Sequence, residues 1–215
     1  MTFPNAFEGI KKVFLAQILA LIGSGCSIIG SVTGALGLVA GSTATGVGGG
    51  LFVLAGVVLS LLSLIFNLIG LSRASKDEET FKKAFFVSLV SLILSVILSI
   101  FSIAGIGGSV LSGLSNIITT VLGIILIAHI IKGIWSLAQK MGRNDVADKG
   151  QRLLSFLWAA YGVTIFCYVM MLLFSSSAGV LSVIGILSFV SGIAMIVGYI
   201  LYLVHLNRAK NMLAE

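Results

Sequence analysis

The chain has 215 residues, of which 58% are hydrophobic and 9% are charged, and its mean hydropathy is +1.18. Soluble domains carry about a quarter of their residues as charged side chains, so this composition excludes a soluble globular protein and indicates an integral membrane protein. The net charge of +6 is best explained by basic residues near a membrane surface, and nucleic-acid binding is disfavoured.

The charged side chains fall into four short patches, which lie at residues 8–12, 73–83, 132–152 and 208–215. About 50 to 60 uncharged residues separate neighbouring patches, enough to cross a bilayer twice at about 20 residues per crossing. These apolar runs lack the alternation of barrel strands, which favours helices. The predicted fold class is therefore all-α: a polytopic helical membrane bundle of six transmembrane helices in three hairpins.

The six spans are expected approximately at residues 13–39, 50–72, 84–104, 110–134, 153–174 and 179–205. Runs of glycine and small polar residues predict turns at 41–50, 105–109 and 175–179. Ser75 and Glu78 have the spacing of a capping box before the third span, and Asn144 or Asp145 is expected to cap the helix that leads into the fifth. The single domain, 1–215, divides into hairpins at approximately 1–76, 77–149 and 150–215.

The hairpins begin and end with similar sequences, and their openings lie about 70 residues apart. Lys11-Lys12-Val13-Phe14 opens the first, and Lys82-Lys83-Ala84-Phe85 opens the second. Two interpretations stay open. The similarity indicates a threefold internal repeat, or selection for basic residues on one side of the membrane places them at these positions without any repeat.

All 13 Lys and Arg residues lie at the same end of the predicted bundle, and the three loops at the other end hold none. The positive-inside rule then places both termini in the cytoplasm, and the bacterial cytoplasmic membrane is the expected location. The apolar core of the first span is too long for a signal peptide, which disfavours cleavage there.

Small and weakly polar residues recur at steps of three and four along spans 2 to 4, which keeps them on one helix face. They are predicted either to pack helices together or to line a polar path. The candidate residues are Gly56, Ser60, Ser63, Asn67, Ser91, Ser95, Ser99, Asn116 and Thr120.

No Asp, Glu, Lys or Arg is expected in the middle of a span, which argues against ion coupling, voltage sensing and acid–base catalysis inside the bilayer. Cys26, Cys167, His129 and His205 have no metal-ligand spacing around them, so no metal or cofactor is expected. An enzyme would depend on the carboxylates outside the membrane: Asp77, Glu78, Glu79, Asp145 and Asp148.

The preferred functional hypothesis is a non-enzymatic membrane protein that acts through helix–helix contacts as an accessory subunit or scaffold. Its partners would be the lipid bilayer and either another membrane protein or a second copy of the chain. A channel or facilitator for a small neutral or apolar solute is the first alternative, with the Ser and Asn faces lining the path. A membrane enzyme is the second.

Overall fold

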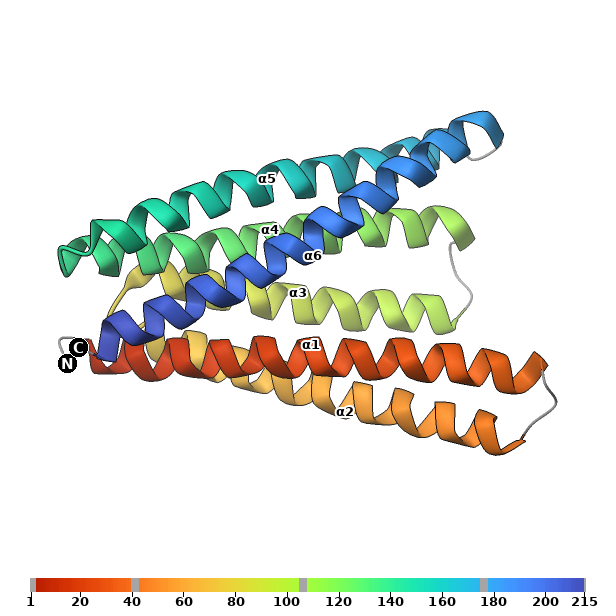
Figure 1. Cartoon of the computed structure of the whole chain (residues 1–215), viewed down its shortest axis with the longest axis horizontal. Helices are drawn as coiled ribbons and strands as arrows, with labels where there is room; N and C mark the ends of the chain where they lie inside the picture. The colour runs from red at the N-terminus through yellow and green to blue at the C-terminus, as the bar shows by residue number, and fades with distance from the viewer. Residues whose placement is uncertain (1–2, 40–42, 105–107, 175–177, 215) are drawn as a thin grey trace.

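The computed structural model describes residues 3–39, 43–104, 108–174 and 178–214. This part of the chain folds into helices and contains no strand (Figure 1). The helices are α1 (Pro4–Val39), α2 (Thr43–Ala74), α3 (Glu79–Ile103), α4 (Gly108–Lys140), α5 (Asn144–Leu173) and α6 (Ala178–Ala214). All six are long and apolar enough to cross a membrane, as the sequence predicts.

The helices are longer than the spans expected from hydropathy, and the additional turns lie mainly at the end that carries the charges. Helix α4 runs to Lys140 and α6 to Ala214, beyond the expected limits of residues 134 and 205. A helix of 36 residues such as α1 is about 54 Å long, against about 30 Å of hydrocarbon. The charged ends of these helices therefore extend past the apolar slab.

The turn predicted at residues 41–50 is wrong over most of its length, because α2 already begins at Thr43. The glycines at positions 46 and 48–50 are helical, and Gly49 is buried against α1. A methyl group on Gly49 would lie 2.6 Å from the backbone nitrogen of Gly34. Glycine is needed here for a close contact between helices. In the sequence alone, such a run of glycines looks the same as one that forms a turn. Residues 105–107 and 175–177 of the other two predicted turns lie outside the described residues.

The capping box predicted for Ser75 and Glu78 is also wrong. The Ser75 hydroxyl donates to the carbonyl of Ser72 at 2.7 Å, and Glu78 accepts from Ser136 and Lys140 of α4 instead. Likewise, α5 has Arg143 at its N-cap position without a side-chain cap, so neither Asn144 nor Asp145 serves as one. For Glu78, contacts with α4 replace the expected local cap.

The first turn of α1 is capped by a residue from the α2–α3 connection. Asp77 accepts hydrogen bonds from the Ala6 backbone N–H at 2.7 Å and from the Asn5 amide at 2.9 Å. A carboxylate at a helix N-terminus satisfies free N–H groups and interacts favourably with the helix dipole. This contact fixes the start of α1 against the start of the second hairpin.

The hydrophobic core lies mainly toward the charged end, where all six helices contribute. Its largest fully buried side chains include Ile10, Leu71, Phe81, Leu137 and Tyr202. Away from this end, large apolar side chains such as Leu54 and Phe189 are exposed, as expected for surfaces that face lipid.

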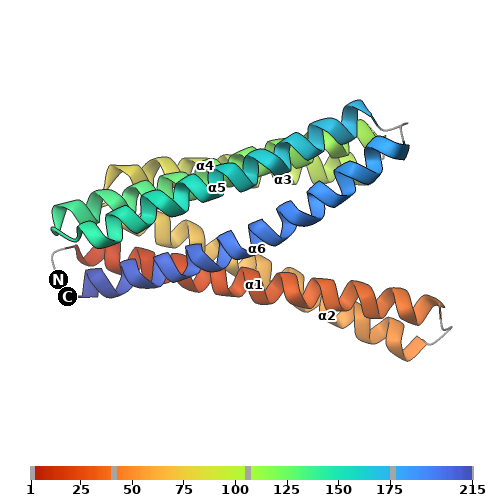
Figure 2. The ribbon, with the colours of Figure 1, turned by 45° about the horizontal axis from the view of Figure 1, so that its top comes forward.

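Helix α6 connects the two parts of the bundle. Figure 2 shows the α1–α2 hairpin diverging from α3, α4 and α5 away from the chain termini, with α6 running from α5 toward α1. The Tyr199 hydroxyl of α6 donates to the carbonyl of Gln17 on α1 at 2.7 Å. The three hairpins thus have different surroundings, and the threefold repeat stays a prediction.

Candidate functional site

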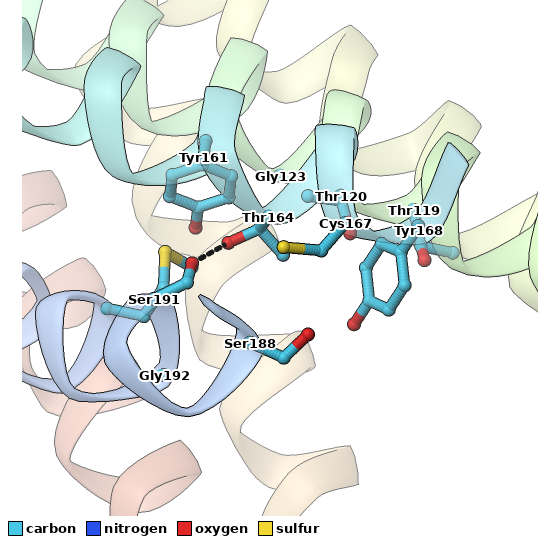
Figure 3. Close-up of a pocket in the computed structure, with 11 residues that line it drawn as sticks. Thr119, Thr120, Gly123, Tyr161, Thr164, Cys167, Tyr168, Ser188, Ser191 and Gly192 are labelled. Atoms are coloured by element: carbon cyan, nitrogen blue, oxygen red, sulfur yellow. Dashed lines mark hydrogen bonds between the residues drawn. The ribbon is translucent and has the colours of Figure 1, made fainter. Parts of the chain in front are cut away.

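A polar pocket of about 410 Å³ lies within the membrane-spanning part of the bundle, between α4, α5 and α6. Every residue that lines it is uncharged. Figure 3 shows these side chains converging from the three helices. They are Thr119, Thr120, Gly123, Tyr161, Thr164, Cys167, Tyr168, Ser188, Ser191, Gly192 and Met195.

The threonine hydroxyls of the pocket donate to carbonyls one turn earlier in their own helices. Thr120 donates to Asn116 at 2.6 Å, and Thr119 donates to Ser115 at 2.8 Å. This back-bonding satisfies each hydroxyl hydrogen and makes the residue inexpensive to place in a membrane. The oxygen keeps lone pairs that can accept from another molecule.

Hydrogen bonds of Ser191 across the pocket join α6 to α5. The hydroxyl oxygens of Thr164 and Ser191 lie 2.6 Å apart, and Thr164 also donates to the Ala160 carbonyl at 3.0 Å. Ser191 also donates to the Ala160 carbonyl at 3.4 Å, so either hydroxyl can be the donor between the two. Ser191 is buried, so this contact fixes the floor of the pocket rather than its opening.

Three further hydroxyls make no hydrogen bond within the described part of the chain. They belong to Tyr161 and Tyr168 on α5 and to Ser188 on α6, and Figure 3 shows them directed into the space between these helices. Each can both donate and accept. Together with the threonine oxygens, they provide hydrogen-bonding positions for a neutral molecule within largely apolar walls, as is usual for small-molecule sites.

The predicted small-residue face of α2 packs against α1. Gly56 is buried, and a methyl group there would lie 2.7 Å from the Gly23 carbonyl oxygen. Ser63 is buried and donates to the Ala16 carbonyl at 2.7 Å. Asn67 lies one turn further along, is also buried, and its side-chain oxygen has no hydrogen-bond partner among the described residues.

The remaining predicted residues are scattered. Ser95 and Ser99 of α3 are exposed, while the Ser91 hydroxyl is buried without a partner in the described part of the chain. Asn116 of α4 is exposed. Among the predicted residues, Thr120 alone lines the pocket described above. Ser60 contacts the α1 interface near Gly23 and donates to the Gly56 carbonyl at 2.9 Å.

Most of the pocket was not anticipated, because its side chains come from α5 and α6. A signal was present in the sequence. Tyr161, Thr164 and Tyr168 follow steps of three and four along α5, and Ser188, Ser191 and Met195 do the same along α6. Such steps place residues on one helix face. A search for faces of serine and glycine does not detect this face, because its tyrosine, cysteine and methionine residues are counted as apolar.

The histidines and cysteines lie apart from one another. Within the described ranges, no group of three His, Cys, Asp or Glu residues is placed to hold a metal ion. Cys26 and Cys167 are free thiols, and Cys167 forms part of the pocket wall. His205 is buried, and its imidazole ring lies against Gly150.

At the charged end, Glu78 joins the α2–α3 connection to α4. It accepts from Lys140 at 2.6 Å, from Ser136 at 3.0 Å and from Thr80 at 3.0 Å. Burial of this carboxyl raises its pKa, but these hydrogen bonds and the Lys140 charge outweigh that effect and hold the pKa of Glu78 below its ordinary value. Glu78 is therefore ionised and structural at neutral pH.

The other carboxylates proposed for chemistry have different surroundings. Asp77 caps α1, and Asp145 pairs with Arg143 at 3.3 Å. Arg73 forms a further ion pair, with Glu8 of α1. Glu79 and Asp148 form no ion pair in the described part of the chain.

The fold and the site together define the class of this protein as an integral membrane bundle with a neutral polar pocket. No family model matches the chain, and no curated protein and no solved structure is found to be similar to it.

Proposed function

We propose that this protein is a non-enzymatic membrane facilitator that binds small uncharged molecules carrying hydroxyl or carbonyl groups. The pocket between α4, α5 and α6 is the observation that supports this proposal. Its volume of about 410 Å³ falls in the range of small-molecule sites, and its lining offers hydroxyls without a single charge. An ion would lose its hydration in such a site without a compensating charge, which favours neutral solutes.

The orientation belongs to the same proposal. The lysines and arginines gather at the end where Figure 1 shows both termini, and the positive-inside rule assigns that end to the cytoplasm, with the bacterial cytoplasmic membrane as the location. The pocket would then lie between the cytoplasmic core and the outer ends of α4, α5 and α6. A solute would enter from the outer, more loosely packed half of the bundle.

A matched pair of glycines on α6 provides the test. Gly192 lines the pocket and Gly185 does not, while an added methyl group would meet nothing within 4 Å at either position. Gly192→Leu should fill the pocket, and Gly185→Leu places the same side chain two turns away. Both variants should insert and fold.

The measurement is glycerol entry into liposomes that contain the purified protein, followed by light scattering. Wild type and Gly185→Leu should accelerate glycerol entry over empty liposomes at least tenfold, and Gly192→Leu should not. Lactate, a charged solute of similar size, should enter no faster than in empty liposomes. Equal glycerol entry for Gly192→Leu and Gly185→Leu would contradict the proposal.

The accessory-subunit hypothesis keeps support from a different observation. Asn116 is exposed in a membrane-spanning helix, and its side-chain amide makes no hydrogen bond within the described part of the chain. Amides in a bilayer favour hydrogen bonds to a neighbouring helix. If the chain acts as a subunit, purification in mild detergent from its host should recover a stoichiometric membrane partner, and Asn116→Leu should weaken that association. A wild-type chain recovered alone would exclude this second candidate.

A further inference from the structure

A second pocket lies at the charged end of the bundle, between α3, α4 and α5. Its volume is about 600 Å³, larger than that of the neutral pocket. Its lining is rich in hydrogen-bond donors from all three helices. These residues are Thr80, Lys83, His129, Ile131, Lys132, Trp135, Ser136, Gln151 and Leu154.

Two lysines supply the positive charges of this pocket. Lys83 comes from α3 and Lys132 from α4, both are exposed, and neither forms an ion pair in the described part of the chain. The nearest acid in contact with the lining is Glu78, which bonds to Thr80 and Ser136. Lys140 pairs with Glu78 at 2.6 Å and compensates its charge. Glu79 lies one turn before Lys83 on α3. The pocket thus presents two ammonium groups, and the carboxylate in contact with its lining, Glu78, is already paired with Lys140.

The uncharged members of the lining also favour an anion. The Trp135 indole can only donate, and the Gln151 amide can donate two hydrogen bonds. His129 adds no donor, because its Nδ1 lies 2.8 Å from the Ile125 carbonyl oxygen and donates to it, which leaves Nε2 of the neutral ring as an acceptor. Several donors around two lysines suit a phosphate group, which offers acceptors in several directions.

The position of the pocket identifies the source of the phosphate. The side chains of Lys83, Lys132 and Trp135 lie where the helices leave their apolar segments, and Trp135 is 39% exposed. Tryptophan is enriched at the level of lipid headgroups, and basic pockets between membrane helices bind anionic headgroups. Leu154 provides an apolar contact for the adjoining glycerol and acyl region.

We infer that this basic pocket, formed by Lys83, Lys132, Trp135 and Gln151, binds the phosphate headgroup of an anionic phospholipid. The site is separate from the neutral pocket and would couple the charged end of the bundle to the lipid composition of one leaflet. A lipid bound there would join α3 to α4 through the two lysines, in addition to the contact of Glu78 with Ser136 and Lys140.

The test compares two double variants of equal charge in detergent-solubilised protein. Lys83→Gln with Lys132→Gln removes both cations of the pocket. Lys11→Gln with Lys82→Gln removes two exposed lysines of the same end that line none of the described pockets and form no ion pair in the described ranges. The readout is the thermal unfolding midpoint as dioleoyl phosphatidylglycerol or dioleoyl phosphatidylcholine is added.

Phosphatidylglycerol should raise the midpoint of the wild type and of the Lys11/Lys82 variant at similar concentrations, and phosphatidylcholine should not. The Lys83/Lys132 variant should need at least tenfold more phosphatidylglycerol for the same shift. Equal loss in both variants would overturn the site, because it would show attraction to the overall charge. A shift of the same size with phosphatidylcholine would overturn it as well.

A soluble phosphate ester tests whether the bound phosphate belongs to a lipid or to a soluble molecule. Glycerol 1-phosphate should not shift the unfolding midpoint at concentrations at which phosphatidylglycerol saturates the wild type. A shift equal to that with phosphatidylglycerol would mean that the ligand is a soluble phosphate ester, and it would overturn the proposal. If the Lys83/Lys132 variant fails to fold, Trp135→Phe with Gln151→Leu removes two neutral donors and should also weaken phosphatidylglycerol. The Gly192→Leu variant should bind the lipid as wild type does, so failure of one site is separable from failure of the other.

Discussion

The α1–α2 hairpin and the α4–α5–α6 group are both rich in glycine, serine and threonine, yet they use these residues in opposite ways. In the hairpin, Gly30 and Gly56 bring two backbones together, so that an added methyl group would lie 2.7 Å from a backbone atom of the other helix. In the second group, an added methyl group on Gly192 would meet nothing within 4 Å, and the small residues leave a pocket.

The difference depends on what the small residues face. Across the hairpin, glycine faces glycine or serine, and the helices approach closely along their length. Across the pocket, the small residues of α4 and α6 face Tyr161 and Tyr168, whose rings hold the helices apart (Figure 3). A face of small residues therefore predicts close packing only when the partner helix has a matching face.

The largest effect on stability is expected in the hairpin. Gly30→Ala should lower the free energy of unfolding by about 1–3 kcal/mol, because the methyl group would meet the Gly49 carbonyl oxygen and the Val53 nitrogen, each at 2.7 Å. Gly25→Ala on the same helix is the control, since an added methyl group there meets nothing within 4 Å. Unfolding in mixed micelles with a denaturing detergent measures both. Equal losses for the two variants would refute the close contact.

The next effect concerns the charged end, where the two regions share one core. The folded pKa of Glu78 lies below its ordinary value of 4.5, so its ionised form stabilises the fold above that value. This contribution is lost as the pH falls through the lower, folded pKa. Wild-type stability should therefore drop between about pH 5 and about pH 3 by more than that of Glu78→Gln, which lacks the titrating group. Identical pH profiles would contradict the assignment.

A smaller effect is expected for the hydrogen bond that closes the hairpin. Ser63→Ala removes the donor to the Ala16 carbonyl and should lower the free energy of unfolding by about 0.6 kcal/mol, the average for such bonds in membranes. Ser99→Ala is the control, because that exposed hydroxyl donates within its own helix at 2.7 Å. The mixed-micelle assay should find no loss for Ser99→Ala. If Ser99→Ala lost as much stability as Ser63→Ala, the hydrogen bond between the helices would contribute no more than one within a helix.

The smallest loss of stability is expected inside the pocket. Gly192→Ala adds a methyl group where nothing lies within 4 Å, and alanine favours helix over glycine by up to about 1 kcal/mol. The variant should be at least as stable as wild type, in contrast to Gly30→Ala. A loss comparable to that of Gly30→Ala would show that α6 packs at Gly192 as closely as α1 packs on α2.

Much of this architecture follows from the sequence, since the placement of charges specifies six helices in a membrane. The positions of the helix ends do not follow in the same way. The sequence of Gly46–Gly50 predicts a turn, because the α1 glycines that pack against Gly49 are distant in sequence and cannot be recognised as its partners. Ser75 and Glu78 read as a capping box because Lys140 and Ser136, which bind Glu78, come from α4.

The candidate site shows the same limitation. Thr120 belongs to a recognisable small-residue face, and the structure places it in the pocket. Gly56 and Ser63 belong to an equally regular face, and they pack against α1. Periodicity identifies a face of a helix, but the helix that covers that face is set by tertiary packing. Thr164 and Ser191 could be joined only once α5 and α6 were placed side by side.

The reactivity of Cys167 tests the neutral pocket most directly. This thiol lines the pocket and is free, and Cys26→Ser leaves it as the single cysteine of the chain. In proteoliposomes, methyl methanethiosulfonate, a small neutral reagent, should modify Cys167, and glycerol should slow the reaction in a concentration-dependent way. Gly192→Leu should block the modification and Gly185→Leu should not. A Cys167 that reacts at the same rate with and without glycerol, and in both leucine variants, would contradict a solute-binding pocket between α4, α5 and α6.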